Sequence, residues 1–317
     1  MNIRLSQIAQ KTFLLLAVCH MPYAICGCQN QQLYKENRAM MGTFVEVISP
    51  DKRAINTVFA EIKRIEDLLS KYKEDSEVSR LNKMAKSKVS PDTFYVIKKA
   101  KEFWQASEGA FDITVGPLMD LWGFTDKRFS APDAEQVKQA LKLVGSDEII
   151  LQESDNVVEF RNLGMKIDLG AIAKGYALDC AVNRLKENGI NSCLINAGGQ
   201  VYALGDKLGA PWRIAIKNPR GKDIVDYLEL RDESVSTSGD YEQYFIQDNK
   251  RYSHILNPKT GYPLDSGVIS ATVIAPSGLT ADALSTAISV LGKAKGEELA
   301  KKFPGTEVRI WEEKDVK

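Results

Sequence analysis

Apolar residues recur at intervals of three and four over residues 51–72, the spacing that places side chains on one face of an amphipathic helix. A second helix is framed by Ser90 and Pro91, a capping residue and a favoured first residue, and by Gly109 just beyond its end. Glycines also end two further apolar patterns. These signals predict helices over residues 51–72, 91–108, 133–144 and 170–188, and a last helix that begins near Thr280.

Short apolar or alternating runs, separated by turn residues, predict β-strands along the rest of the chain. Helices dominate the first half and strands outnumber them in the second, with neither an internal repeat nor a low-complexity linker. We therefore expect one α+β domain with a mixed, mainly antiparallel sheet and flanking helices. The predicted strands are TFVEVI from residue 43, EIILQ from 148, VVEF from 157, MKID from 165, SCLIN from 192, VYALG from 201, WRIAIK from 212, VDYLEL from 225, QYFIQ from 243, VISATVIA from 268 and TEVRIWE from 306.

The balance of charge argues against one broad class of function. Lysine plus arginine and aspartate plus glutamate each number 42, so the formal net charge is zero. A protein that binds nucleic acid needs a basic face, and this composition gives no sign of one. Apolar residues make up 44% and charged residues 26% of the chain, which is typical of a globular protein with a substantial core.

The first 28 residues differ in kind from the remainder. Arg4 and Lys11 precede the apolar run TFLLLAVCHMPYAI, a pattern typical of a secretory signal and too short to span a bilayer comfortably. The following ICGC resembles a bacterial lipobox, so we expect lipidation at Cys28 and attachment to the extracytoplasmic side of a membrane in the cell envelope. Plain secretion with cleavage nearby is the alternative. The chain then divides into a signal peptide (1–28), a tether (29–38) and a single domain (39–317).

Outside the leader only two cysteines and one histidine remain. Cys180 and Cys193 could pair in an oxidising compartment, but their patterns favour two buried, small apolar side chains. Zinc-binding spacings, the glycine-rich nucleotide-binding motifs and the G-x-S-x-G hydrolase motif are all absent from the sequence. His254, in YSHILNPKTGYP, titrates near neutral pH, although a structural histidine at a strand end is favoured when it is taken alone.

Two stretches combine charged and small residues at predicted helix starts. In TADALSTA, Asp282 and Thr286 lie four apart on one helix face, where their oxygens suit magnesium rather than zinc. Spacing alone favours a simpler role, in which Thr280 caps the helix and Asp282 interacts with its dipole. In KIDLGAIAKGY, free N–H groups and Lys174 would bind an anion, while Asp168 holds a donor on a ligand. A tight strand-to-helix junction capped by Asp168 explains that stretch equally well.

Eight motifs together resemble the ApbE family, the FAD:protein FMN transferases. They stand in the order of that family and span roughly residues 40–291. The resemblance implies a single ApbE-like, T-fold-related α+β domain, and many members are bacterial lipoproteins. The chain departs from the family at Gln200, where many members carry Asn or Asp. The motifs are MMGTFVEV, SKYKEDSEVSRLN, GAFDITVGPLMDLWGF, KIDLGAIAKGYALD, INAGGQVYALG, TSGDYE, HILNPKTGYP and TADALSTA.

The resemblance also implies two sets of site residues. A magnesium ion would be held by the backbone carbonyl of Ala171 together with Asp282, Ser285 and Thr286. FAD would be bound by Met41, Tyr72, Ala110, Phe111, Asp112, Asp168, Lys174 and Ile255.

The reaction that the resemblance implies is a transfer at phosphorus. A threonine or serine hydroxyl of an acceptor flavoprotein attacks the FMN phosphorus of FAD and AMP leaves, which requires positioning and charge stabilisation. His254 is the expected general base, and magnesium would neutralise charge on the departing AMP. The acceptors that the resemblance implies are subunits of sodium-translocating NADH:quinone reductase or Rnf-type complexes, or another extracytoplasmic flavoprotein. The alternatives are an FAD pyrophosphatase that releases FMN and AMP, and a lipoprotein that only binds flavin.

Overall fold

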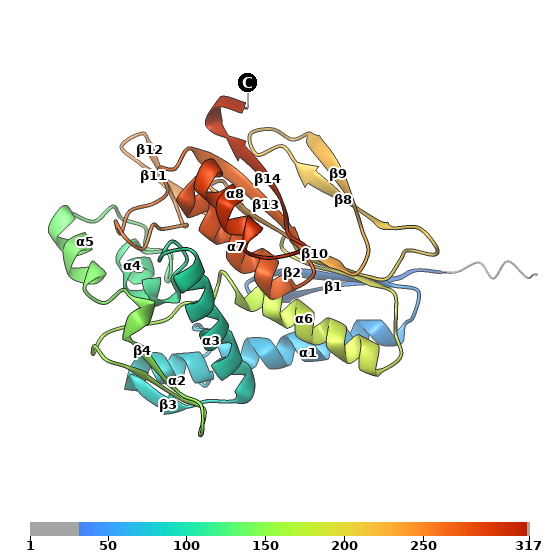
Figure 1. The fold of residues 1–317 in the computed structure, drawn as a ribbon, viewed down its shortest axis with the longest axis horizontal. Helices are drawn as coiled ribbons and strands as arrows, with labels where there is room; N and C mark the ends of the chain where they lie inside the picture. The colour runs from blue at the N-terminus through green and yellow to red at the C-terminus, as the bar shows by residue number, and fades with distance from the viewer. Residues whose placement is uncertain (1–31, 316–317) are drawn as a thin grey trace, which may run out of the picture. The chain divides into compact units, whose positions relative to one another are not determined.

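The computed structural model of the chain describes residues 32–315, in which a seven-stranded sheet is the central element (Figure 1). Its strands lie in the order β1-β2-β6-β7-β10-β13-β14, and each neighbouring pair is antiparallel. The predicted α+β class with a mainly antiparallel sheet is confirmed. The strands are β1 (Tyr34–Met40), β2 (Thr43–Ser49), β6 (Cys193–Ala197), β7 (Gln200–Leu204), β10 (Glu233–Gly239), β13 (Val268–Ala275) and β14 (Glu307–Glu312).

Three smaller antiparallel sheets accompany the central one. The hairpin β11–β12 turns at Asp248 and Asn249, whose φ angles of 52° and 58° are those of a two-residue turn that matches the twist of the strands. The small sheets are β3 (Lys86–Lys88) with β5 (Val157–Phe160) and β4 (Ile149–Gln152), β8 (Trp212–Lys217) with β9 (Ile224–Leu230), and β11 (Tyr244–Gln247) with β12 (Lys250–Ser253).

Helices α1, α6 and α7 pack against one face of the central sheet, where they bury the main core. All the longer predicted helices form, and the structure adds the short α2, α4 and α8. The helices are α1 (Arg53–Leu69), α2 (Glu77–Met84), α3 (Pro91–Ala106), α4 (Gly116–Leu121), α5 (Ala134–Leu141), α6 (Ala173–Glu187), α7 (Gly278–Leu291) and α8 (Lys293–Lys301), with 3-10 turns η1 (Ile113–Val115), η2 (Ser146–Glu148) and η3 (Glu313–Asp315).

The hairpin β8–β9 covers the opposite face of the sheet. Trp212 and Leu228 from this hairpin pack on Val201 and Ile274 of the sheet, while Val273, next along the same strand, faces the helices. Because both faces are covered, β13 is buried at every position. This arrangement explains why its sequence, VISATVIA, is a continuous run with few polar residues rather than an alternating pattern.

The structure corrects the boundary between the predicted tether and the domain. Residues 34–38, assigned above to a tether, belong to β1, which pairs with β2 from Tyr34 opposite Ser49 to Met40 opposite Thr43. The assignment failed because β1 is an edge strand with mainly exposed, polar side chains, so no apolar alternation marks it. The predicted signal peptide, Cys28 and residues 29–31 lie outside the described residues.

The predicted strand MKID, residues 165–168, does not form. The main-chain N–H of Ile167 donates to the side chain of Asn82 at 2.8 Å, and its carbonyl accepts from the same side chain at 2.9 Å. The N–H of Asp168 donates to the carbonyl of Ile113. The segment is therefore held by a side chain and a turn, because no neighbouring strand is available to it.

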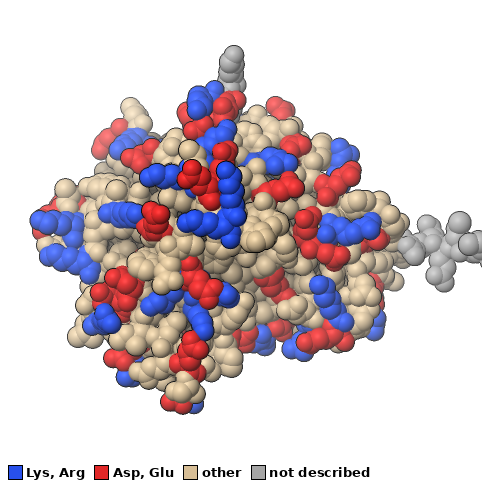
Figure 2. All heavy atoms as spheres, in the orientation of Figure 1, with Lys and Arg blue, Asp and Glu red and all other residues tan. Residues whose placement is uncertain are grey.

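Charges are mixed over the face that Figure 2 shows, where lysine and arginine alternate with aspartate and glutamate. This distribution agrees with the zero net charge of the chain. No helix within residues 32–315 has the length and apolar character that a membrane-spanning helix requires.

Helices α6 and α7 approach each other through glycines. A Cβ atom on Gly175 would lie 2.1 Å from the carbonyl oxygen of Gly278, and one on Gly278 would lie 2.5 Å from the carbonyl oxygen of Gly175. No other residue type fits at that separation. The two glycines thus bring the first turn of α6 against the first turn of α7.

We expect Gly175→Ala to lower the free energy of unfolding by about 1–3 kcal/mol, the usual cost of overpacking. The loss should appear although alanine is intrinsically better than glycine in a helix by about 1 kcal/mol. Urea unfolding measures the change. Asn183→Ala, at an exposed position on the same helix, is the control and should be neutral. Equal stability of Gly175→Ala and the parent chain would show that the helices separate at no cost.

Candidate active site

At the α6–α7 junction each helix supplies a carboxylate to the first turn of the other. Asp282 of α7 accepts the N–H of Gly175 at 2.9 Å. Asp179 of α6 accepts the N–H groups of Gly278 at 2.6 Å and Leu279 at 2.9 Å. These N–H groups have no partner inside their own helices, and the positive end of each helix dipole favours a carboxylate. Asp282 is 3% exposed, so this reciprocal exchange fixes a buried carboxylate at the junction.

The exchange leaves a carbonyl oxygen free at the start of α6. In a continuous helix the N–H of Gly175 would donate to the carbonyl of Ala171, four residues earlier. It donates to Asp282 instead, and within the described residues the Ala171 carbonyl accepts no main-chain hydrogen bond. Lys174 lies at the same place, with Nζ 2.9 Å from the carbonyl oxygen of Gly170 and 3.6 Å from Oδ1 of Asp282.

Hydroxyl groups of α7 face strand β10. Ser238 Oγ is 2.8 Å from Ser285 Oγ and 3.2 Å from Thr286 Oγ1, and the Ser285 hydroxyl also donates to the main-chain carbonyl of Asp282. Ser285 is fully buried and Thr286 is half-buried. The helix itself is capped by Ser277, which accepts the N–H of Thr280, so the predicted cap at Thr280 is wrong by one turn of chain.

A buried ion pair lies beside this junction. Lys71 Nζ is 2.8 Å from Asp168 Oδ2, and the two side chains are 9% and 14% exposed. Lys71 also donates to Thr125 Oγ1, while Asp168 accepts the N–H of Gly170 at 2.8 Å. Burial acts to lower the pKa of Lys71, but the surrounding acidic groups, Asp168 foremost, together outweigh burial and raise that pKa above its ordinary value. Lys71 therefore stays charged and joins the loop after α1 to the segment that leads into α6.

His254 follows directly after β12. Its main-chain nitrogen and its ring Nδ1 each lie 3.0 Å from the carbonyl oxygen of Gln243. A carbonyl only accepts hydrogen bonds, so Nδ1 carries the proton and Nε2 keeps a lone pair. Burial lowers the pKa of His254 below its ordinary value, although the hydrogen bond to the Gln243 carbonyl opposes the shift, and the charge of Lys174 acts in the same direction as burial. The ring is thus set up as a neutral base at neutral pH.

Residues 41–310 match the sequence model of the ApbE family. The chain belongs to this family. A relative from Klebsiella pneumoniae (strain 342), named FAD:protein FMN transferase, is 37% identical over 274 residues, or 84% of this chain and 85% of the relative. The crystal structure of the ApbE protein from Thermotoga maritima has a TM-score of 0.84 and 38% identity over 89% of this chain and 95% of its own. The flavin transferase ApbE from Vibrio cholerae has a TM-score of 0.78 and 31% identity over 88% and 93%.

The ApbE resemblance named eight FAD residues, and the structure places them in different settings. Ala110, Phe111 and Ile255 are buried, whereas Tyr72 is 67% exposed. Met41 lies between β1 and β2 with a left-handed φ of 51°, and its N–H donates to Glu66 at 2.7 Å.

Asp112 is committed to contacts inside the protein. Its carboxylate accepts the N–H and hydroxyl of Thr114 at 2.8 and 2.6 Å, and the hydroxyl and N–H of Ser146 at 2.7 and 3.1 Å. Burial raises its pKa, while these hydrogen bonds oppose the shift. Its side chain caps η1 and binds η2 in place, so a contact with FAD would come from its main chain.

Gln200, the departure from the family pattern, is the first residue of β7 and is buried against the start of α7. Its side-chain nitrogen donates to Ser234 Oγ at 2.9 Å and to the carbonyl of Gly278 at 3.3 Å. Its side-chain oxygen has no hydrogen-bond partner among the described residues. The longer amide thus reaches the α6–α7 contact and helps to hold it.

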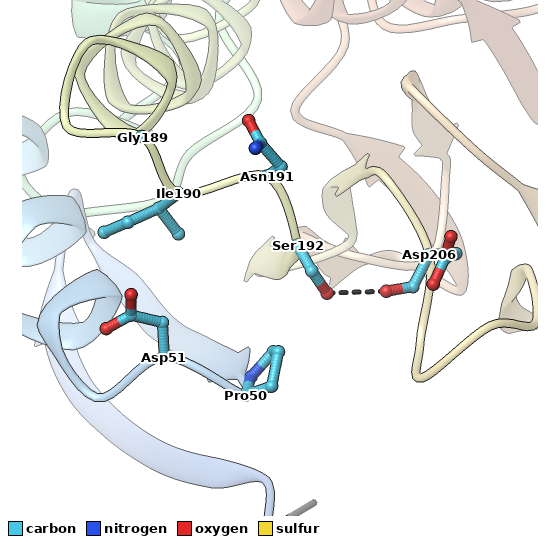
Figure 3. A pocket seen from close by; sticks show the side chains of 7 residues that line it. All are labelled: Pro50, Asp51, Gly189, Ile190, Asn191, Ser192 and Asp206. Atoms are coloured by element: carbon cyan, nitrogen blue, oxygen red, sulfur yellow. Dashed lines mark hydrogen bonds between the residues drawn. The ribbon is translucent and has the colours of Figure 1, made fainter. Parts of the chain in front are cut away.

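Two cavities are lined by described residues outside the expected FAD and metal sets, and one of them reaches Asp179 and Ser277 at the α6–α7 junction. One, of about 310 Å³, is lined by Pro50, Asp51, Asp206 and residues 189–192, and in it the Ser192 hydroxyl donates to the carbonyl of Asp206 (Figure 3). The other, of about 440 Å³, lies beside Tyr95 and Tyr176. Neither contains a residue expected to bind FAD or metal, so the candidate site rests on the geometry around α6, α7 and His254.

Sequence reasoning missed two residues of this geometry. Lys71 stands in the motif SKYKEDSEVSRLN, and a lysine on a polar loop gives no sign that it will be buried against Asp168. Gln243 acts through its main-chain carbonyl, which every residue type possesses. Neither contact leaves a signal in residue type or spacing.

Proposed function

We propose that this chain is an FAD:protein FMN transferase, which moves the FMN part of FAD to a threonine or serine hydroxyl of an acceptor flavoprotein and releases AMP. The names of its relatives support the reaction class. The observation that carries the proposal is the ring of His254, whose Nδ1 is bound by the Gln243 carbonyl so that Nε2 can take a proton. A protein that only carries flavin has no need of such a base.

In the proposed reaction Nε2 of His254 accepts the proton of the acceptor hydroxyl while that oxygen forms a bond to the FMN phosphorus. The bond from this phosphorus to the bridging oxygen breaks, and AMP leaves with the electron pair. Lys174, held between the Gly170 carbonyl and Asp282, adds positive charge near the phosphates. Such a transfer depends on positioning and on fixed charge more than on covalent help.

The oxygens at the α6–α7 junction fit a divalent cation. The Ala171 carbonyl lacks a main-chain donor in the described part of the chain, and Oδ1 of Asp282 has only the 3.6 Å contact with Lys174. Thr286 and Ser285 add hydroxyl oxygens, although that of Ser285 already contacts Ser238. Carbonyl, carboxylate and hydroxyl oxygens suit magnesium. When bound, magnesium would neutralise charge on the departing phosphate.

His254→Ala should still bind FAD but transfer FMN about 10²-fold more slowly or worse, the usual loss for a general base. Mass spectrometry of the acceptor domain of a sodium-translocating NADH:quinone reductase, after incubation with FAD and MgCl₂, measures the transfer. In the parent chain the rate should rise with pH and level off before neutrality, through an apparent pKa below the ordinary imidazole value of about 6.5. Transfer activity is lost as the pH falls through the lowered pKa of His254, because imidazolium cannot accept a proton.

Two results would count against this assignment. Unchanged transfer by His254→Ala would make the histidine structural. Free FMN and AMP in place of the flavinylated acceptor would favour the FAD pyrophosphatase, in which water replaces the hydroxyl at the same site.

Asp282 has two roles that two substitutions separate. Asp282→Asn keeps an oxygen for the N–H of Gly175, so its free energy of unfolding should stay within about 1 kcal/mol of the parent. Its affinity for Mn²⁺, measured by electron paramagnetic resonance, should fall by about tenfold or more, and magnesium-dependent transfer should fall with it. Asp282→Ala leaves that buried N–H without a partner and should cost about 1–3 kcal/mol in addition. An Asn variant with parental Mn²⁺ affinity would remove Asp282 from the metal site.

We also propose that the chain is lipid-anchored at Cys28 and acts on an acceptor exposed on the extracytoplasmic side of a membrane. The basis is the sequence ICGC after a basic and apolar leader. Cys28→Ser should move the protein from the membrane fraction to the soluble fraction, as an immunoblot of fractionated cells would show. Cys26→Ser is the matched control and should stay with the membrane. An unmodified N-terminus in the parent chain would contradict the proposal.

A further inference from the structure

A clamp lies behind the turn that orients His254. Arg220, in the connection between β8 and β9, binds both carboxylate oxygens of Asp240, with Nη1 2.7 Å from Oδ1 and Nη2 2.8 Å from Oδ2. Nη2 also lies 2.7 Å from an oxygen of Glu313 in η3. The Arg220 and Asp240 side chains are 24% and 18% exposed, so the pair is partly shielded from water. Paired, charge-assisted hydrogen bonds of this kind fix direction as well as distance.

Hydrogen bonds within the β8–β9 connection fix the main chain at Arg220. The side chain of Asn218 accepts the N–H of Arg220 at 2.9 Å, and the N–H of Asn218 donates to the carbonyl of Asp223 at 2.8 Å. Strands β8 and β9 on either side are anchored on the sheet through Trp212 and Leu228. The guanidinium is therefore presented from a hairpin that packs independently of the β10–β11 turn.

Asp240 opens the turn of residues 240–243, which connects β10 to β11. The main-chain bonds of this turn are long, 3.2 Å from the N–H of Asp240 to Ile269 and 3.4 Å from that of Glu242 to Gly239. The two bonds from Arg220 are the shortest restraints on it. The turn ends in Gln243, whose carbonyl accepts both the main-chain N–H and the ring Nδ1–H of His254.

We propose that Arg220 is a positioning residue for the transfer: by clamping Asp240 it holds the Gln243 carbonyl where it selects the Nδ1–H tautomer of His254. This inference rests on the proposed function of His254 as the base. It assigns a role in the reaction to the β8–β9 connection, whose hydrogen bonds and ion pairs within residues 32–315 reach no residue expected to bind FAD or metal. Without the clamp the ring is free to carry its proton on Nε2, where it cannot act as a base.

The tautomer is directly observable because the whole chain has only two histidines, His20 and His254. Long-range ¹H–¹⁵N spectra of the full chain, with His254→Ala to assign the signals, distinguish a proton on Nδ1 from one on Nε2. The variants are Arg220→Met, which removes the guanidinium, and Asp240→Asn, which leaves one acceptor oxygen and removes the paired, charge-assisted bonds. Glu313→Gln is the matched control, because it removes the charge from the third contact of Arg220 and leaves both bonds to Asp240.

We expect a neutral Nδ1–H ring in the parent and in Glu313→Gln, and a mixture of tautomers in the two clamp variants. Transfer to the acceptor domain should fall about tenfold in the clamp variants, as for a displaced catalytic group. FAD affinity from flavin fluorescence should stay within about twofold, since Arg220 and Asp240 contact none of the expected FAD residues. Arg220→Lys keeps the charge and loses the paired geometry, so it should recover part of the transfer rate. If Arg220→Met does not fold, Arg220→Lys serves as the test of the clamp.

Clamp variants that keep the Nδ1–H ring and a parental transfer rate, even with a lower melting temperature, would overturn the proposal and leave the ion pair structural. Failure of the parent chain to flavinylate the acceptor would instead overturn the proposed function. The spectra still decide whether Arg220 controls the tautomer in that case, so the two failures are distinguishable.

Discussion

The contact between the first turns of α6 and α7 is the constraint on which the candidate site depends. Gly175 and Gly278 let the two backbones meet, and no side chain fits between them. At that separation Asp282 reaches the N–H of Gly175 and Asp179 reaches those of Gly278 and Leu279. The N–H of Gly175, which has no partner within α6, is thereby satisfied by a hydrogen bond between helices. This bond holds a buried carboxylate beside the carbonyl of Ala171, which accepts no main-chain hydrogen bond among the described residues.

The charged side chains around the site lie in pairs, and each pair fixes the positions of its two members. Lys71 holds Asp168, and Lys174 lies between Asp282 and the carbonyl of Gly170. Buried charges of this kind persist only where partners satisfy them. His254 carries no such partner on Nε2 among the described residues, and its pKa is lowered by burial. The pairs thus supply fixed charge, while the histidine remains available for proton transfer.

The rest of the fold supports this site from two sides of one sheet. Helices α1, α6 and α7 cover one face, and the β8–β9 hairpin covers the other. Arg220 of the β8–β9 connection binds Asp240, just after the end of β10. The β11–β12 hairpin is outside the sheet, and a two-stranded hairpin is marginal alone. Stacking of Phe245 on Phe129 and the contact of Tyr252 with Trp122 hold it against the rest of the chain, which in turn places His254.

Residue patterns alone predicted the α+β class, the longer helices and most of the strands, because periodic burial leaves a direct mark on the sequence. They also placed Asp282 and Thr286 on one helix face, since local spacing determines that relation. The short α2, α4 and α8 and the polar edge strand β1 escaped, because elements so short or so polar owe their stability to neighbours. Whether Asp282 is exposed or buried, whether Lys71 meets Asp168, and which carbonyl receives the proton of His254 were decided only by the tertiary structure. Two of these contacts join segments distant in sequence and the third joins the two ends of the β11–β12 hairpin. Two of the three use main-chain groups that every residue shares, so no residue type or spacing encodes them.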